Sequence, residues 1–288
     1  MKMGIVAHKR KKLASEIARN LISYLEKKKE EGEDIEIVLD EFIFNSMGID
    51  GLESQPVNEM KVDFIICIGG DGTILRTLQV SEAPVLGINA GSLGFLTEVP
   101  PENMKNAIDQ MISGNYTIEK RSRIKTMLND ERLPDATNEA VVATSTPSKI
   151  QDFELYIDME WAQRIRADGI IISTPTGSTS YALSAGGSVI DPRLEAMEIV
   201  PIAPFRINSR PFIIPDTAVI NLKIAHRTRT ANLVLDGFIR RTIRNKDELL
   251  FTRSKTYSHF IRFDVSFYRK LQEKIILERP NVNKKGKY

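Results

Sequence analysis

One glycine-rich turn carries an acidic residue where phosphate groups commonly bind. The apolar run 62–68 predicts a buried strand, and Gly69-Gly70-Asp71-Gly72-Thr73 follows it and leads into a predicted helix. Backbone N–H groups of such a turn, together with the helix N-terminus, bind phosphate oxygens. A carboxylate at this place repels its ligand unless it binds a metal or takes up a proton. Asp71 therefore suggests phosphoryl transfer, and the alternative is a turn aspartate that bonds to its own backbone.

A second segment is rich in small hydroxyl groups. Residues 173–187 follow an apolar strand predicted over 169–172, and eight of these fifteen residues are Ser, Thr or Tyr. So many hydroxyls supply donors and acceptors of hydrogen bonds, which indicates a binding site for a polar ligand.

The first 116 residues alternate predicted strands with predicted helices. Such alternation favours a parallel sheet with helices on its faces. Ligands of these sheets bind beyond the carboxyl ends of the strands, which is where the turn at 69–72 falls. The strands are expected over residues 3–7, 35–39, 62–68 and 84–88.

From residue 117 the pattern changes to alternation with a period of two. Runs such as 153–158 and 218–224 predict an all-β domain, and the stretch 267–276 returns to helical spacing. We therefore expect an α/β plus all-β protein whose final helix packs back on the first domain. Its expected parts are an α/β domain over 1–116, a β-rich domain over 117–262, and a C-terminal helix and tail over 263–288.

The composition is that of an ordinary globular protein. The 288 residues include 42% hydrophobic side chains, enough for two cores, and carry a formal net charge of only +2. This balance argues against a nucleic-acid partner, and no apolar segment approaches the roughly 18 residues that a membrane span needs. The start of the chain runs from a short apolar strand into charge, which is not typical of a signal peptide. A cytoplasmic location is therefore expected.

Two further features are interpreted as structural. The basic run Lys9-Arg10-Lys11-Lys12 is expected to be the solvated end of a helix. The single cysteine, Cys67, lies inside an apolar run and is expected to be a core thiol, and one cysteine excludes an internal disulfide. The sequence has no Cys/His set with zinc-ligand spacing, so no metal site built by the protein is expected.

Four segments taken together resemble the NAD kinase family, whose members phosphorylate NAD to NADP. They are the turn 69–73, Asn89-Ala90-Gly91-Ser92-Leu93-Gly94-Phe95-Leu96, Asn138-Glu139, and Asp168-Gly169 leading into residues 176–187. The turn alone also resembles lipid kinases and phosphofructokinases, whereas the hydroxyl-rich segment is more specific.

The resemblance implies an α/β domain that bears the glycine turn and a β-sandwich-like domain that bears the NAD site. It also implies a C-terminal helix that rejoins the first domain. The implied substrates are NAD and ATP, with Mg²⁺ or another divalent cation delivered with ATP. The implied assembly is a homodimer or homotetramer in which a neighbouring subunit can complete the substrate site.

The resemblance also assigns roles to single residues. Asp71 is implied to be the general base that accepts the proton of the adenosine 2′-hydroxyl of NAD, and Arg76 to reach a phosphate. Asn138 and Glu139 are implied to bond ribose hydroxyls. The other implied contacts of the substrates are Gly72, Lys149, Arg166, Asp168, Thr176, Thr179, Ser180, Tyr181, Ala182, Leu183, Ser184 and Asp236. Phe238 departs from the family pattern, because Gln usually follows the Asp-Gly pair.

Two other functions stay open from the residues. A lipid or sugar kinase would share the turn at 69–72 but would not need Asn138-Glu139 or the segment 179–184. A sensor that binds NAD or NADP without turnover is expected to lack the carboxylate of Asp71, which is present. Phosphorylation of another acceptor, or tight binding without turnover, distinguishes these alternatives.

Overall fold

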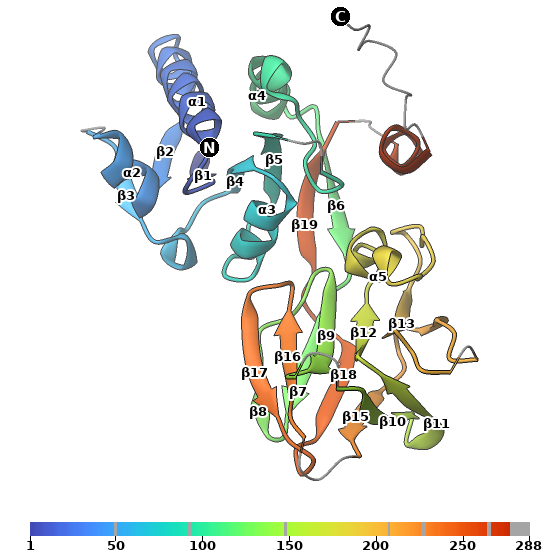
Figure 1. Ribbon diagram of the computed structural model, residues 1–288. Helices are drawn as coiled ribbons and strands as arrows, with labels where there is room; N and C mark the ends of the chain where they lie inside the picture. The colour runs from blue at the N-terminus through green and yellow to red at the C-terminus, as the bar shows by residue number, and fades with distance from the viewer. Residues whose placement is uncertain are drawn as a thin grey trace, which may run out of the picture.

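A seven-stranded sheet forms the centre of the N-terminal half (Figure 1). The computed structural model describes residues 1–48, 51–91, 94–146, 149–206, 208–225, 229–263 and 266–276. Neighbouring strands follow the order β3-β2-β1-β4-β5-β19-β6, and the first five of these are parallel. Their bounds are β1 (Lys2–Ala7), β2 (Glu36–Asp40), β3 (Glu53–Gln55), β4 (Phe64–Gly69) and β5 (Val85–Asn89).

Helices cover both faces of this sheet, which is why the strands read as nearly continuous apolar runs. On one face, α1 (Lys12–Glu30) and α4 (Met104–Ile112) bury Leu21 and Ile108 in a cluster with Ile66 of β4. On the other face, α3 (Asp71–Leu78) packs Ile74 against Cys67, which is a buried free thiol as expected. The smaller elements are α2 (Glu41–Met47) and the 3₁₀ turns η1 (Val57–Glu59) and η2 (Pro101–Asn103).

Two strands that the predicted division assigns to the β-rich domain belong to the first sheet instead. β19 (Ser258–Arg262) pairs with β5 in parallel, and β6 (Thr117–Arg121) pairs with β19 in antiparallel fashion. Phe260 and Ile261 are buried in the two apolar clusters of the α/β half. Alternation along a strand shows that one face is buried but not which sheet buries it. The expected boundaries at 117 and 262 therefore need this correction.

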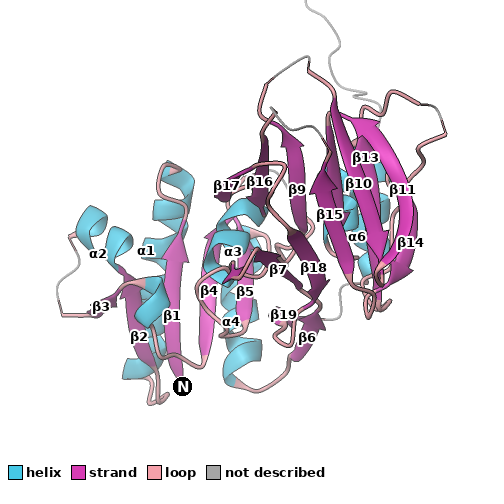
Figure 2. Cartoon of the chain, turned by 90° about the horizontal axis from the view of Figure 1, so that it is seen from below, coloured by secondary structure: helices cyan, strands magenta, loops and turns pink. Residues whose placement is uncertain are grey.

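Two six-stranded antiparallel sheets form the second half (Figure 2). They share one core, in which Phe153 and Leu222 of one sheet meet Ile170 and Leu233 of the other. One sheet contains β7 (Ile124–Leu128), β8 (Glu131–Arg132), β10 (Gln151–Ile157), β11 (Glu160–Ala167), β15 (Ile220–Ile224) and β18 (Leu249–Arg253). The other contains β9 (Glu139–Thr144), β12 (Gly169–Ser173), β13 (Ala196–Ile202), β14 (Phe212–Pro215), β16 (Ala231–Leu235) and β17 (Ile239–Ile243). The expected sandwich-like domain is confirmed.

The last described helix returns to the first domain, as expected. α6 (Phe267–Leu271) continues into a π-helical turn over Gln272–Ile276. The Nζ of Lys270 donates to the carbonyl of Thr97 at 3.1 Å and to Oε2 of Glu98 at 2.5 Å, and both acceptors lie in the loop after β5. Among the described residues, no helix is both long enough and apolar enough to cross a membrane.

Candidate active site

Asp71 begins α3 directly beyond the carboxyl end of β4, and a distant loop holds its side chain. Oδ2 accepts a hydrogen bond from the backbone N–H of Phe95 at 2.7 Å. Oδ1 accepts from the N–H groups of Leu96 at 3.0 Å and Thr97 at 3.3 Å. The alternative of an aspartate that bonds its own turn is therefore wrong. Each carboxylate oxygen has two acceptor positions, so Oδ2 keeps one for a substrate hydroxyl.

The second glycine motif provides the space for this carboxylate. A Cβ at Gly94 would overlap the Asp71 carboxyl group, whereas a Cβ at Gly91 would meet only the end of the flexible Lys11 side chain. Gly94 is therefore required by the close approach of Asp71. Ser92 and Leu93 of the same motif lie outside the described residues.

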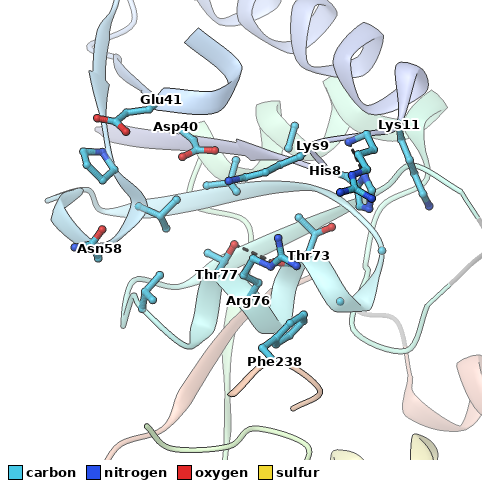
Figure 3. Close-up of a pocket in the computed structure, with 18 residues that line it drawn as sticks. His8, Lys9, Lys11, Asp40, Glu41, Asn58, Thr73, Arg76, Thr77 and Phe238 are labelled. Atoms are coloured by element: carbon cyan, nitrogen blue, oxygen red, sulfur yellow. Dashed lines mark hydrogen bonds between the residues drawn. The ribbon is translucent and has the colours of Figure 1, made fainter. Parts of the chain in front are cut away.

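A cavity of about 810 Å³ lies beside the glycine turn (Figure 3). Its wall is formed by the loop after β1, the junction of β2 with α2, the glycine turn with the first turns of α3, and Phe238. The residues that these elements supply include His8, Lys9, Arg10, Lys11, Asp40, Glu41, Gly70, Gly72, Thr73 and Arg76. The basic run 9–12 is exposed at the start of α1, as expected, and its first three residues also line this cavity. They follow β1 at its carboxyl end, which is the same edge of the sheet as Asp71.

The start of α1 adds to the positive charge of this cavity. The helix begins at Lys12, has no acidic residue in its first turn and has no side-chain cap at Lys11. A helix N-terminus carries a partial positive charge, and acidic residues normally balance it. Basic residues at this position instead favour an anionic ligand.

Arg76 extends from α3 toward the cavity and stacks on an aromatic ring. Its guanidinium carbon lies 5.0 Å from the ring centroid of Phe238, and both residues line the cavity (Figure 3). The Phe that replaces the usual Gln at position 238 therefore supports Arg76 through a cation–π contact.

Asp236 has a structural role, because the protein itself binds its carboxylate. Its side chain accepts hydrogen bonds from the N–H groups of Thr137, Asn138 and Glu139 at 2.8, 2.8 and 3.1 Å. The Nε2 of Gln79, at the end of α3, donates a fourth bond at 3.0 Å. Because these four donors occupy both oxygens of the carboxylate, the structure leaves Asp236 no acceptor position for the expected contact with the dinucleotide.

The backbone conformation of the turn at 236–237 explains why Asp and Gly occupy it. Asp236 and Gly237 have φ values of 46° and 79°, and the N–H of Phe238 donates to the carbonyl of Leu235 at 3.0 Å. Positive φ at both central residues defines a type I′ hairpin turn, for which Asp-Gly is a favoured pair. This turn connects β16 and β17 and aims the carboxylate at the start of β9.

Asn138 and Glu139 present unpaired acceptors beside the hydroxyl-rich segment. Oδ1 of Asn138 and Oε2 of Glu139 are buried and receive no hydrogen bond from any described residue. The Ser180 hydroxyl donates to Oε1 of Glu139 at 3.4 Å. Burial, reinforced by the negative charge of Asp236, raises the pKa of Glu139 to about 8. Two free acceptors at one place suit the hydroxyl groups of a ribose.

The hydroxyl-rich segment forms η3 (Gly177–Thr179) and α5 (Tyr181–Ser184) after β12. Tyr181 and Ser184 are exposed, and Thr179, Ser180 and Leu183 are half-buried, so these five can meet a ligand. Two other expected contacts pack inside the protein instead. Thr176 is buried and its Oγ1 accepts from Nη1 of Arg121 at 3.3 Å. Ala182 is buried with Val141, Ile171 and Val200.

Asp168 lies at the far end of β9, where its carbonyl accepts from the N–H of Thr144. Arg166 precedes it on β11 of the other sheet, and Lys149 lies in the loop after β9. β12 is antiparallel to β9, with Ser173 opposite Glu139 and Gly169 opposite Ala143. Four residues of strand separate the two ends by about 14 Å. Within one chain the structure therefore does not bring these three residues to Glu139. Arg166 instead lies 4.9 Å from the exposed ring of Phe205.

A buried ion network supports the loop that holds Asp71. Glu98 accepts from Nη1 of Arg262 at 2.9 Å and from Lys270. Arg262 also donates to the carbonyl of Leu96 at 3.1 Å and to Oε2 of Glu119 at 2.8 Å. Among the described residues, no group of three or more His, Cys, Asp or Glu side chains could hold a metal ion.

The fold and the site together define a two-domain phosphotransferase. Its α/β domain holds a carboxylate at a glycine turn beside a basic cavity, and its β-rich domain carries the hydroxyl-rich segment. Residues 3–116 match the ATP-NAD kinase N-terminal domain, and residues 137–263 match the ATP-NAD kinase C-terminal domain. The chain belongs to the NAD kinase family, as the resemblance implied, and its activity is ATP-dependent phosphorylation of NAD.

Similar proteins cover nearly the whole chain. It is 41% identical over 279 residues to the NAD kinase of Methanothermobacter thermautotrophicus, covering 96% of each chain. It is 42% identical over 279 residues to the NAD kinase of Thermococcus kodakarensis, covering 96% of this chain and 99% of the relative. An NAD kinase from Archaeoglobus fulgidus in complex with ATP has a TM-score of 0.78 and 29% identity, covering 95% of this chain and 98% of that one. Yeast NADH kinase complexed with NADH shares the fold, with a TM-score of 0.88 at 21% identity, covering 100% of this chain and 89% of that one.

Proposed function

We propose that this chain transfers the γ-phosphoryl group of ATP to the 2′-hydroxyl of the adenosine ribose of NAD, and that Asp71 accepts the hydroxyl proton. The observation that carries the proposal is the Asp71 carboxylate, which three backbone N–H groups fix in place and which keeps one acceptor position on Oδ2. A secondary hydroxyl is a poor nucleophile at neutral pH. Base catalysis of this kind is typically worth about 10² to 10⁴ in rate.

The basic cavity supports a site for the donor. Lys9, Arg10, Lys11 and Arg76 line it together with the glycine turn. Cationic side chains and two helix N-termini suit the phosphates of ATP, which keep negative charge after Mg²⁺ binds. We propose that the divalent cation enters with ATP as part of this substrate, where it neutralises charge on the phosphates.

The second half supports a site for NAD. Oδ1 of Asn138 and Oε2 of Glu139 would accept hydrogen bonds from ribose hydroxyls, and Ser180 stands next to Glu139. Tyr181 is 44% exposed, so its ring is free to stack on a base or on nicotinamide. Thr179, Leu183 and Ser184 would form the remaining wall.

We also propose a homodimer or homotetramer that acts in the cytoplasm. Lys149, Arg166 and Asp168 would then contact NAD bound to a neighbouring subunit, since about 14 Å of strand separates them from Glu139 in their own chain. The exposed side chain of Phe205, at 64%, lies against Arg166 and offers apolar surface at this end. The free thiol of Cys67 fits a reducing compartment.

Subunit mixing tests this assembly. Asp71→Asn and Arg166→Ala variants are each expected to have low activity, and mixing them is expected to restore part of it, because mixed oligomers contain some complete sites. Sedimentation would report the size of the assembly in parallel. A fully active monomer would contradict the shared site.

Product analysis tests the function itself. The purified protein is incubated with NAD and Mg-ATP, and NADP is measured with an NADP-specific dehydrogenase, while NMR locates the new phosphate on the 2′-oxygen. We expect NADP as the product. Diacylglycerol or a sugar phosphorylated in place of NAD would replace the proposal with another kinase activity. NAD binding without product from ATP or polyphosphate would indicate a sensor.

A further inference from the structure

Lys274, in the π-helical turn after α6, places a cation beside Asp71 that the site described above does not use. Its Nζ is shielded from solvent and forms no hydrogen bond with any residue that the structure describes. It lies 3.9 Å from the ring centroid of Phe95, whose N–H donates to Oδ2 of Asp71. Lys274 therefore faces the residue that holds the carboxylate.

The contacts of α6 fix the position of this cation. Lys270, one turn earlier on the same helix face, bonds Glu98 and the carbonyl of Thr97. The hydroxyl of Tyr268 donates to Asp191 at 2.7 Å, which ties the helix to the β-rich domain as well. The helix is thus held between the two halves, and residues four apart lie on one face. Lys274 must then lie over the 95–98 loop.

The two lysines of this face differ in one respect. Lys270 has two protein partners, which satisfy its charge inside the fold. Lys274 has an aromatic ring on one side and no hydrogen-bond acceptor among the described residues. Burial, together with the charges of Lys270 and Arg262, outweighs the opposite effect of Asp71 and Glu273 and lowers the pKa of Lys274 to about 8. A shielded ammonium group without an acceptor is uncommon in proteins and calls for a ligand that supplies one.

We propose that Lys274 binds the terminal phosphate of the donor beside Asp71, so that the C-terminal segment completes the transfer site. The inference rests on the proposed function and deepens it. The 2′-oxygen forms its bond to the γ-phosphorus as the bond from that phosphorus to the bridging oxygen of ADP breaks. The hydroxyl proton passes to Asp71, and Lys274 keeps its protons and bonds a non-bridging oxygen. Such a cation stabilises the charge of the phosphoryl group in the transition state.

Lys274→Met removes the charge and keeps much of the side-chain volume. We expect kcat to fall about 10²-fold while the affinity for NAD stays within about twofold. Calorimetry should show weaker binding of a non-hydrolysable ATP analogue by about tenfold and unchanged binding of ADP, because only the terminal phosphate loses a partner. Arg269→Met is the matched control, since Arg269 is exposed on the same helix and pairs with Glu273 at the surface. It should keep wild-type rates.

Chemical rescue separates charge from structure. In Lys274→Cys, alkylation with bromoethylamine restores an ammonium group at nearly the original length, whereas iodoacetamide adds a neutral group of similar size. Cys67 is fully buried, and burial raises the pKa of its thiol to about 12, so modification should be confined to the new cysteine. We expect bromoethylamine, and not iodoacetamide, to return kcat to within about fivefold of wild type.

The outcomes are separable. An active Lys274→Met variant with kcat within threefold of wild type, or rescue by neither reagent, would overturn the role of Lys274 and leave the proposed function intact. A wild-type protein that makes no NADP from any donor would overturn the proposed function. Binding of the ATP analogue would then decide the role of Lys274 by itself.

Discussion

At the residue scale, the two carboxylates of the site differ in what surrounds them. Asp71 is held by three backbone N–H groups, which orient its carboxylate. Glu139 is buried, receives one hydrogen bond from the Ser180 hydroxyl, and lies near the negative charge of Asp236. These surroundings suit Asp71 to accept a proton and Glu139 to bind a hydroxyl group.

The buried carboxyl group of Glu139 predicts a pH-dependent stability. Its pKa rises from 4.5 in the unfolded chain to about 8 in the folded protein. Below pH 4.5 both states hold the proton, so nothing is lost. As the pH rises toward 8, the unfolded state releases the proton first, and the folded state loses stability relative to it. Glu139→Gln does not titrate, so its stability advantage over wild type should grow by on the order of 4 kcal/mol between pH 4.5 and 8.

Denaturant unfolding at several pH values measures this difference. Glu160→Gln, at an exposed position of β11, is the control for loss of a carboxylate and should track wild type across the range. A constant difference between Glu139→Gln and wild type from pH 4.5 to 8 would contradict the account of Glu139.

At the element scale, the site forms where loops from parallel strands meet. The strand, glycine turn and helix around Asp71 could be predicted because their signals are local in the sequence. The partners of Asp71 at 95–97 could not, because they come from a loop 24 to 26 residues away. The place of the basic run 9–12 in the cavity could have been predicted from its position in the sequence. The run directly follows a buried strand and therefore lies at the ligand-binding edge of the sheet.

The close approach of α3 to the loop after β5 predicts that substitution of Gly94 lowers the activity strongly. In Gly94→Ala, the new methyl group would overlap the Asp71 carboxylate and displace it or the loop. We expect NADP formation to fall about 10²-fold or more, because a misplaced base loses most of its contribution. Steady-state kinetics on the purified variant measures the change.

Gly91→Ala is the matched control, since its methyl group meets only the end of the Lys11 side chain. It should retain activity within a few-fold of wild type. Equal losses in both variants would mean that the loop, and not the space for Asp71, is sensitive to substitution.

At the scale of the whole molecule, two elements of the C-terminal part of the chain support the site. β19 and α6 return from the β-rich half and join the first domain through Arg262, Lys270 and Glu98. Periodicity predicted the helix in the stretch 267–276. It could not predict that β6 and β19 complete the first sheet, since strand pairing depends on contacts distant in sequence. Alternation predicted an all-β domain and the family resemblance implied its sandwich, but neither predicted the register that separates Arg166 from Glu139.

Glu98 is the centre of these contacts, and we expect its removal to lower the stability strongly. Its side chain is 1% exposed and pairs with Arg262 and Lys270, whose side chains are 10% exposed. Glu98→Ala leaves two buried cations without this partner, which should cost about 3 to 5 kcal/mol. Glu53→Ala breaks a surface pair with Lys2 and should cost less than about 1 kcal/mol. Denaturant unfolding compares the two, and equal costs would contradict the role of Glu98.

The most direct test of the account is turnover by Asp71→Asn, with NAD binding measured on the same preparation. Removing the base should lower kcat for NADP formation by about 10² to 10⁴ and leave the Kd for NAD within a few-fold of wild type. This result would establish Asp71 as the group that accepts the hydroxyl proton. A variant that keeps kcat within a few-fold of wild type, or that loses NAD binding in proportion to its activity, would contradict the central claim.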